Sequence, residues 1–130
     1  MSSQVFEKGQ KCEENFIGDA FINYLVVDDM FDCKVYDVFF EAGARNYWHK
    51  HEDGQILLCT SGVGCYQEKG KPARRLKKGD VVKIPPDVEH WNGAAPNNDF
   101  THIGISPCVS QGRYTWLEPV TDEEYIEATR

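Results

Sequence analysis

Residues 43–62 read GARNYWHKHEDGQILLCTSG, and they are the most informative part of the chain. His49 and His51 are separated by one residue, so on a β-strand both side chains project from the same face. Their Cα atoms then lie about 7 Å apart, which allows both imidazoles to reach one metal ion at about 2.1 Å. The turn signal at Glu52-Asp53-Gly54 can fold the chain back and bring Gln55 beside His51. This stretch therefore predicts strands that share a metal site.

Short strands separated by turn residues account for most of the remaining sequence. Their apolar, β-branched or aromatic runs alternate with turn signals such as Ser61-Gly62 and Gly79-Asp80. This pattern is typical of a β-sandwich or a closed barrel. A capping-box pattern, Thr121-Asp122-Glu123-Glu124, predicts a short C-terminal helix that closes one end of the barrel. The expected strands cover residues 21–27, 34–41, 55–60, 64–68, 80–84 and 100–105.

Length and composition indicate one compact domain. The chain has 130 residues, of which 41% are hydrophobic and 12% aromatic. We expect a polar N-terminal arm over residues 1–14 and a single β domain over residues 15–130. The net charge of −7 argues against nucleic acid or an anionic membrane as a partner, and no apolar run is long enough to span a membrane. The five cysteines form no CxxC pair, which favours free thiols in a reducing cytoplasm.

Two blocks of the sequence together resemble the motifs of the cupin superfamily. The first block is Gly43, five residues, His49, one residue, His51, three residues, Gln55, six residues and Gly62. The second block is Gly79, five residues, Pro85 and then His90, five positions after the proline. The resemblance covers residues 35–106 and implies an all-β, single-domain double-stranded β-helix (jelly-roll) barrel. It also implies one divalent metal ion, held by His49, His51, Gln55 and His90.

The chain departs from the cupin motifs at three positions. Gln55 replaces the usual glutamate ligand, Asp87 stands at the glycine of the second motif, and Ala94 stands at its final asparagine. Three imidazoles and one amide would leave the ion its full charge, making it a stronger Lewis acid and a better binder of a carboxylate, an enolate or a cyanide ion. In the alternative interpretation the barrel has lost its metal and Gln55 is a hydrogen-bonded core residue; the retention of all three histidines argues against this.

A narrower resemblance comes from residues 40–55, 79–96 and 101–106. They are similar to small single-domain bacterial cupins that include manganese-dependent hydroxynitrile lyases and relatives accompanying carboxymuconolactone decarboxylase-like proteins. This resemblance implies that His102 transfers a proton in the cavity and that the metal is manganese, with iron, nickel, zinc and cobalt as alternatives. Asn92 stands where the lyase-like members have a histidine; it can orient a substrate but cannot take a proton at pH 7.

Four further side chains near the motifs have two possible roles each. Arg45 can anchor a substrate carboxylate or form a structural ion pair. Cys59 has an even spacing from Gln55 and can therefore point into the same cavity, whereas the other expectation is a buried thiol. Trp48 and Trp91 precede and follow metal ligands, so on regular strands they face away from the metal, into the core or a dimer interface, rather than forming a wall of the cavity.

Three classes of function remain open at the level of the sequence. The first is a metal-dependent enzyme, most simply a lyase or isomerase, that acts on a small anionic or carbonyl-containing molecule by Lewis-acid and general-base catalysis. The second is a dioxygenase, and the third is a cupin that senses or stores a small ligand without catalysis. A homodimer is the expected assembly, because small cupins commonly pair through their sheets.

Overall fold

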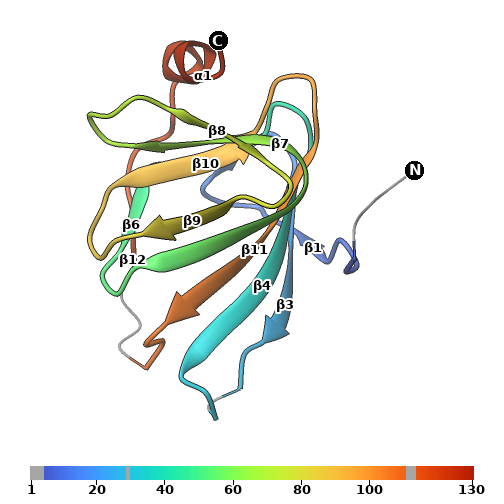
Figure 1. The fold of residues 1–130 in the computed structure, drawn as a ribbon, viewed down its shortest axis with the longest axis vertical. Helices are drawn as coiled ribbons and strands as arrows, with labels where there is room; N and C mark the ends of the chain where they lie inside the picture. The colour runs from blue at the N-terminus through green and yellow to red at the C-terminus, as the bar shows by residue number, and fades with distance from the viewer. Residues whose placement is uncertain (1–4, 29, 111–113) are drawn as a thin grey trace.

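The protein is a curled antiparallel β-barrel followed by one short helix, as the computed structural model shows for residues 5–28, 30–110 and 114–130 (Figure 1). This confirms the predicted all-β barrel with a short C-terminal helix. No helix in this part of the chain has the length and the apolar run that crossing a membrane requires. The elements are β1 (Gln10–Lys11), β2 (Phe16–Ile17), β3 (Ala20–Val26), β4 (Cys33–Phe40), β5 (Arg45–Asn46), β6 (His49–His51), β7 (Gln55–Glu68), β8 (Arg74–Lys77), β9 (Val81–Ile84), β10 (His90–Ala94), β11 (Phe100–Pro107), β12 (Tyr114–Trp116) and α1 (Asp122–Ala128).

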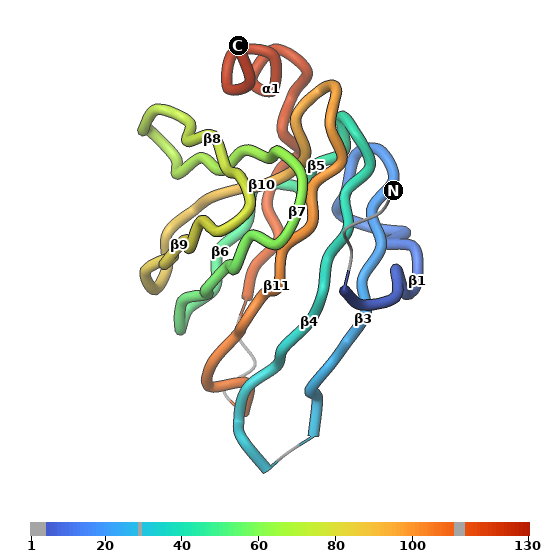
Figure 2. The backbone as a smooth tube through the Cα atoms, turned by 45° about the vertical axis from the view of Figure 1, so that its right-hand side comes forward, coloured from blue at the N-terminus to red at the C-terminus, as the bar shows by residue number. Residues whose placement is uncertain are grey.

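Strand β7 belongs to both halves of the barrel (Figure 2). Its first part pairs with β9 and β11, and its second part pairs with β8 and β10. The sequence predicted two strands separated by a turn at Ser61-Gly62, but the structure has one strand of 14 residues. Gly62 adopts a φ of 80°, and a Cβ there would overlap the carbonyl oxygen of Asp99. The glycine therefore bends the strand between the two sheets without ending it.

The N-terminal part of the chain is paired with the barrel. Strand β1 lies inside the predicted arm of residues 1–14, and its residues pair antiparallel with β3. Strands β1, β2, β5 and β12 were not predicted, because two or three residues are too few to show the alternation of a strand. The division of the chain at residue 14 stays a prediction.

Buried apolar side chains form two clusters. The larger one fills the inside of the barrel and includes Phe40, Leu57 and Phe100, all fully buried. The smaller one lies between the barrel and α1 and contains Trp48, Cys65, Trp91, Val120 and Tyr125. The predicted capping box is present, because Thr121 accepts a hydrogen bond from the backbone of Glu124 and Glu124 reaches back to the backbone of Thr121.

Candidate metal centre

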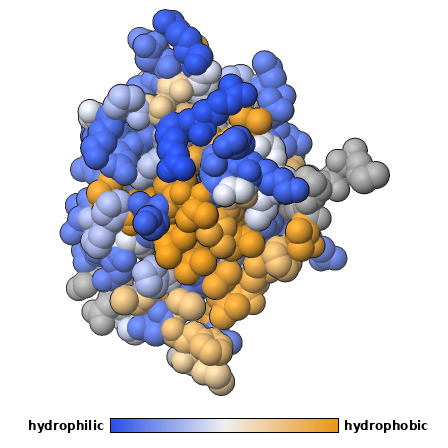
Figure 3. All heavy atoms as spheres, viewed as in Figure 1, coloured by the Kyte–Doolittle hydropathy of each residue, from blue (hydrophilic) through white to orange (hydrophobic). Residues whose placement is uncertain are grey.

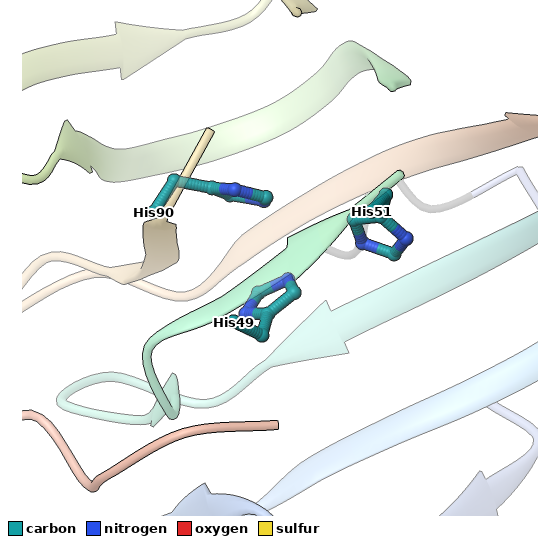
Figure 4. Close-up of side chains that lie close together, drawn as sticks. All are labelled: His49, His51 and His90. Atoms are coloured by element: carbon teal, nitrogen blue, oxygen red, sulfur yellow. The ribbon is translucent and has the colours of Figure 1, made fainter. Parts of the chain in front are cut away.

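Three histidines from two neighbouring strands converge in the barrel (Figure 4). His49 and His51 project from β6, and His90 comes from β10, where it is the cross-strand partner of His49. Their potential ligand atoms all lie within 4.8 Å of one another, and the rings of His49 and His90 have centroids 4.2 Å apart. The one-residue spacing and the distant third histidine therefore form the cluster that the sequence predicted.

Backbone carbonyls fix the proton on two of these rings. His49 Nδ1 lies 2.7 Å from the carbonyl oxygen of Tyr47, and His90 Nδ1 lies 2.9 Å from that of Val88. Because a carbonyl can only accept, each Nδ1 carries the hydrogen and each Nε2 carries the lone pair. This is how metal-binding histidines are commonly oriented in proteins.

Unpaired buried atoms show that the residues present fit a metal ion. His51 Nε2, His90 Nε2 and Gln55 Oε1 are buried and have no hydrogen-bond partner among the described residues. Buried polar atoms are normally paired, so three such atoms on side chains that can bind a metal need an explanation. Imidazole nitrogen and amide oxygen both coordinate divalent metal ions, and a shared ion would satisfy all three.

Burial keeps these histidines neutral at physiological pH. It lowers the pKa of His51 and of His90 to about 4 and the pKa of His49 well below its usual range. Repulsion from His90 adds to the effect of burial at both His49 and His51. A neutral imidazole is the form that binds a metal, so the ring nitrogens need not lose a proton first.

Gln55 begins β7 directly after the turn at residues 52–54. Its Nε2 donates to the hydroxyl of Tyr36, which in turn lies 2.7 Å from the hydroxyl of Ser106. The amide oxygen is the end left without a partner. Gln55 is thus hydrogen-bonded at one end, as the alternative interpretation expected, while its other end is free to bind an ion. Its role as the fourth ligand stays a prediction.

A cavity of about 300 Å³ lies beside the histidines. Its lining is mostly apolar, and the side chains of Val38, Phe40 and Trp116 belong to it. His102 and Asn92 also line it, as the sequence predicted for both, and they are 2% exposed. Burial lowers the pKa of His102 to about 4, so this ring is neutral as well. The cavity therefore combines an apolar wall with a few convergent polar groups, as small-molecule sites commonly do.

Arg45 and Cys59 do not line this cavity, so the structure does not support them as substrate-binding residues. The Arg45 guanidinium donates to the carbonyl oxygen of Val120 at 2.8 Å, pairs with Asp122 at 2.9 Å and lies over the ring of Tyr125. Arg45 thus forms the structural ion pair that was its alternative role. Cys59 is on the same face of β7 as Gln55, but it is packed in the larger apolar cluster, four residues further along the strand. Burial raises the pKa of its thiol to about 11.

The aromatic wall of the cavity comes from residues that sequence reasoning missed. Trp48 and Trp91 face away from the metal ligands, as predicted, and pack under α1. Trp116 is the cross-strand partner of His49, and the two rings have centroids 4.6 Å apart. Tyr114 is the partner of His51 on the same strand, β12. The only sequence signal was the alternation of aromatic residues in Tyr114-Thr115-Trp116, which is too short to predict a strand.

Comparisons with known proteins agree with this fold. Residues 36–100 match the family described as Cupin domain. An (R)-mandelonitrile lyase from Granulicella tundricola is 43% identical over 88 residues, which cover 68% of this chain and 67% of that protein. A cupin-like protein of known structure from Thermotoga maritima is 54% identical, with a TM-score of 0.95 and 98% of both chains covered.

A more distant structure shares the fold alone. The DMSP lyase DddQ from Ruegeria pomeroyi is 20% identical, with a TM-score of 0.68 over 79% of this chain and 54% of that one.

Both motifs lie on the strands and turns that bring the histidines together, and the family match spans both of them. The chain therefore belongs to the cupin family.

Proposed function

We propose that this cupin is a metal-dependent enzyme that acts on a small anionic or carbonyl-containing molecule in a lyase-like reaction. The observation that carries the proposal is the set of unpaired ligand atoms, His51 Nε2, His90 Nε2 and Gln55 Oε1, beside a cavity that also contains His102. The relative named (R)-mandelonitrile lyase, 43% identical over the aligned residues, supports a lyase among the three classes.

We propose His49, His51, Gln55 and His90 as the residues that hold the metal, with manganese as the first candidate and iron, nickel, zinc or cobalt as alternatives. All four are uncharged, so a bound divalent ion would stabilise negative charge that develops on a substrate oxygen. The neutral state of the three rings, which burial favours, is required for this set of ligands.

His102 is proposed as the general base of the reaction. Its ring is neutral at pH 7, because burial lowers its pKa to about 4. Its Nε2 lies 3.1 Å from the side-chain nitrogen of Asn92, so a side chain holds this end of the ring. A substrate that reaches Nε2 can therefore transfer a proton to it by displacing one amide hydrogen. Val38 and Phe40 line the same cavity and would limit the access of water.

The test uses untagged protein loaded with manganese, and mandelonitrile as the first substrate. We expect release of benzaldehyde and cyanide by the native protein, and a loss of at least about a hundredfold in kcat for His102→Ala with the metal content unchanged. Unchanged turnover in His102→Ala would remove its role as base. Oxygen uptake with candidate phenolic substrates would instead support a dioxygenase. Tight binding of small ligands without turnover of any of them would support a sensor.

We also propose that the protein is a homodimer. Figure 3 shows apolar surface gathered over β7, β9, β11 and β4. In the cross-strand register, Leu58 of β7 lies between Val81 and Ile103, and Val81 is 50% exposed. Contiguous apolar surface of this kind marks interaction sites, and a second copy of the chain is the occupant that we propose. Leu58→Asp should convert the dimer to a monomer in sedimentation velocity, whereas a native protein that sediments as a monomer would refute the assembly.

A reducing cytoplasm is the compartment that we propose for the protein. All five cysteines are free, and Cys59 and Cys65 are buried. Burial raises the pKa of both thiols to about 11, which suits thiols that persist in the reduced form. Localisation of the tagged protein by microscopy in its source cells would test this.

A further inference from the structure

Three buried polar side chains that line the cavity are linked by hydrogen bonds. The Asn92 backbone N–H donates to Asn46 Oδ1 at 2.9 Å, and Asn46 Nδ2 donates to Asn92 Oδ1 at 2.9 Å. Asn92 Nδ2 lies 3.1 Å from His102 Nε2. Their exposed fractions are 6% for Asn46 and 2% for Asn92 and His102, and all three line the cavity.

The backbone N–H of Asn92 sets the direction of every hydrogen bond that links these three side chains. Because a backbone N–H can only donate, the atom of Asn46 that it meets must be the oxygen. The other atom of the Asn46 amide is then the NH₂ group, which must meet the oxygen of Asn92. The remaining atom of Asn92 is its own NH₂ group, which faces His102 and donates. His102 Nε2 must therefore be an acceptor, and the proton of the neutral ring lies on Nδ1.

This direction leaves each of the two amides with one hydrogen that is not yet donated. Each NH₂ group has two hydrogens, and the bonds above use one of them on each residue. Among the described residues no acceptor takes the second hydrogen of either amide nitrogen. Each amide oxygen accepts one hydrogen bond, which fixes the end of the amide that the NH₂ group occupies. Rotating either amide to offer its oxygen would place two donors or two acceptors against each other.

We propose that Asn46 and Asn92 form a subsite that donates two hydrogen bonds to a carboxylate or another anionic oxygen of the substrate. The proposal rests on the proposed function and gives its substrate class: a small molecule with an oxygen that carries or develops negative charge and faces these amides. His102 acts in the free protein as a positioning residue, because its lone pair fixes the orientation of Asn92. A substrate that directs a hydrogen at either NH₂ group would place two donors against each other in a buried site, which disfavours its binding.

The charged side chains that line the cavity are less buried than the two amides. The charged residues that line the cavity are Lys34, Glu14 and Asp53; Glu14 is exposed, and the other two are half-buried. Solvent screens such groups more than it screens the two buried amides. Recognition of the anion would therefore depend on the fixed amide donors together with the uncharged ligands of the metal site.

Acetate is the probe for the first experiment, with acetamide as its neutral counterpart. Zinc-loaded protein is titrated with each compound while the side-chain amide signals of Asn46 and Asn92 are followed by NMR. We expect acetate to shift these signals and to bind about tenfold more tightly than acetamide. Asn46→Ala and Asn46→Asp should each weaken acetate binding about tenfold or more. Asn97→Asp, which makes the same change of charge at an exposed position, should leave the affinity unchanged.

A second measurement tests the direction of these hydrogen bonds without any ligand. Long-range nitrogen–proton correlation spectra of zinc-loaded protein should show the His102 proton on Nδ1, and a proton on Nε2 would overturn the inference. Equal acetate affinity in Asn46→Ala and native protein would also overturn it. Metal content of the same samples, together with mandelonitrile turnover by each protein loaded with manganese, separates this outcome from a failure of the proposed function. A protein that binds zinc and turns over substrate, yet shows no loss of acetate affinity in Asn46→Ala, refutes the subsite alone.

Discussion

Strand β10 and its neighbours have two buried sides, which differ in whether their polar atoms have hydrogen-bond partners. On the side that faces α1, Trp91 Nε1 donates to Gln67 at 3.1 Å and Arg45 donates to the carbonyl of Val120. On the side that faces the cavity, the buried Nε2 atoms of His51 and His90 have no partner. Both sides are buried, so exposure to water does not explain the difference.

This difference teaches which buried polar residues hold the fold and which are kept for a ligand. An unpaired buried polar atom costs about 1–3 kcal/mol, so several such atoms on metal-binding side chains indicate that something else is to bind there. The side facing α1, which we call the scaffold side, is Arg45, Trp48, Trp91 and the residues of α1 that they contact. The side facing the cavity, the ligand side, is His49, His51, Gln55 and His90.

The largest expected effect is the loss of the metal from the ligand side. His90→Ala removes one of three converging imidazoles, so metal content should fall from about one ion per chain to nearly none. Trp91→Phe changes the adjacent residue on the scaffold side and should keep the metal, at a cost of about 1–2 kcal/mol in the free energy of unfolding. Elemental analysis and urea unfolding of untagged protein measure the two effects.

A full complement of metal in both His49→Ala and His90→Ala would contradict the site. Loss of metal in Trp91→Phe at a temperature where it is fully folded would contradict the separation of the two sides. Circular dichroism of each variant shows whether the fold is retained.

The second effect is a loss of stability in acid that comes from His102. The pKa of His102 is about 4 in the folded protein, below its usual value of 6.5. Between these two pH values the ring is protonated in the unfolded chain and stays neutral in the folded protein. Stability contributed by the neutral ring is present above pH 6.5 and is lost as the pH falls towards 4. His102→Gln should reduce this loss by on the order of 3 kcal/mol. Urea unfolding of metal-free protein at several pH values measures it, and an unchanged pH dependence would contradict the buried, neutral ring.

Much of the ligand side could be predicted from the sequence, because the spacing of its residues follows directly from strand geometry. The one-residue separation of His49 and His51 places both on one face of a strand, and the motif spacing placed His90 beside them. The scaffold role of Arg45 could not be decided, since its partner Asp122 is 77 residues away. Trp116 was missed because it reaches the site on a strand of three residues.

The bend of β7 shows the same limit for the fold. A Ser-Gly pair between two apolar runs predicts a turn, and the local sequence cannot distinguish a turn from a strand that continues at positive φ. The distinction depends on Asp99, whose carbonyl packs against Gly62 from another part of the chain. The alternation of apolar residues and the spacing of the histidines are local properties of the sequence, so they could be used for prediction. Contacts between segments far apart in the chain could not be predicted from it.

The third effect belongs to the scaffold side. Arg45→Met would leave the buried carbonyl of Val120 without its donor, at a cost of about 2 kcal/mol in the free energy of unfolding, while the metal content stays unchanged. Asp122→Asn should change stability by less than about 0.5 kcal/mol, because the side chain of Asp122 is 89% exposed. Thermal unfolding with metal analysis compares them. An equal effect of the two substitutions would mean that the ion pair, and not the carbonyl, accounts for the role of Arg45.

The smallest effect tests whether Gln55 belongs to the ligand side. Gln55→Glu replaces the unpaired amide oxygen by a carboxylate, which binds a cation more strongly, so metal retention against a chelator should improve about tenfold. Gln67→Glu makes the same change of charge on the scaffold side, where Gln67 accepts from Trp91, and should not alter metal retention. If both variants retain metal equally, the gain comes from the added net charge. If neither gains, Gln55 is not a ligand, and its free oxygen must serve the substrate instead.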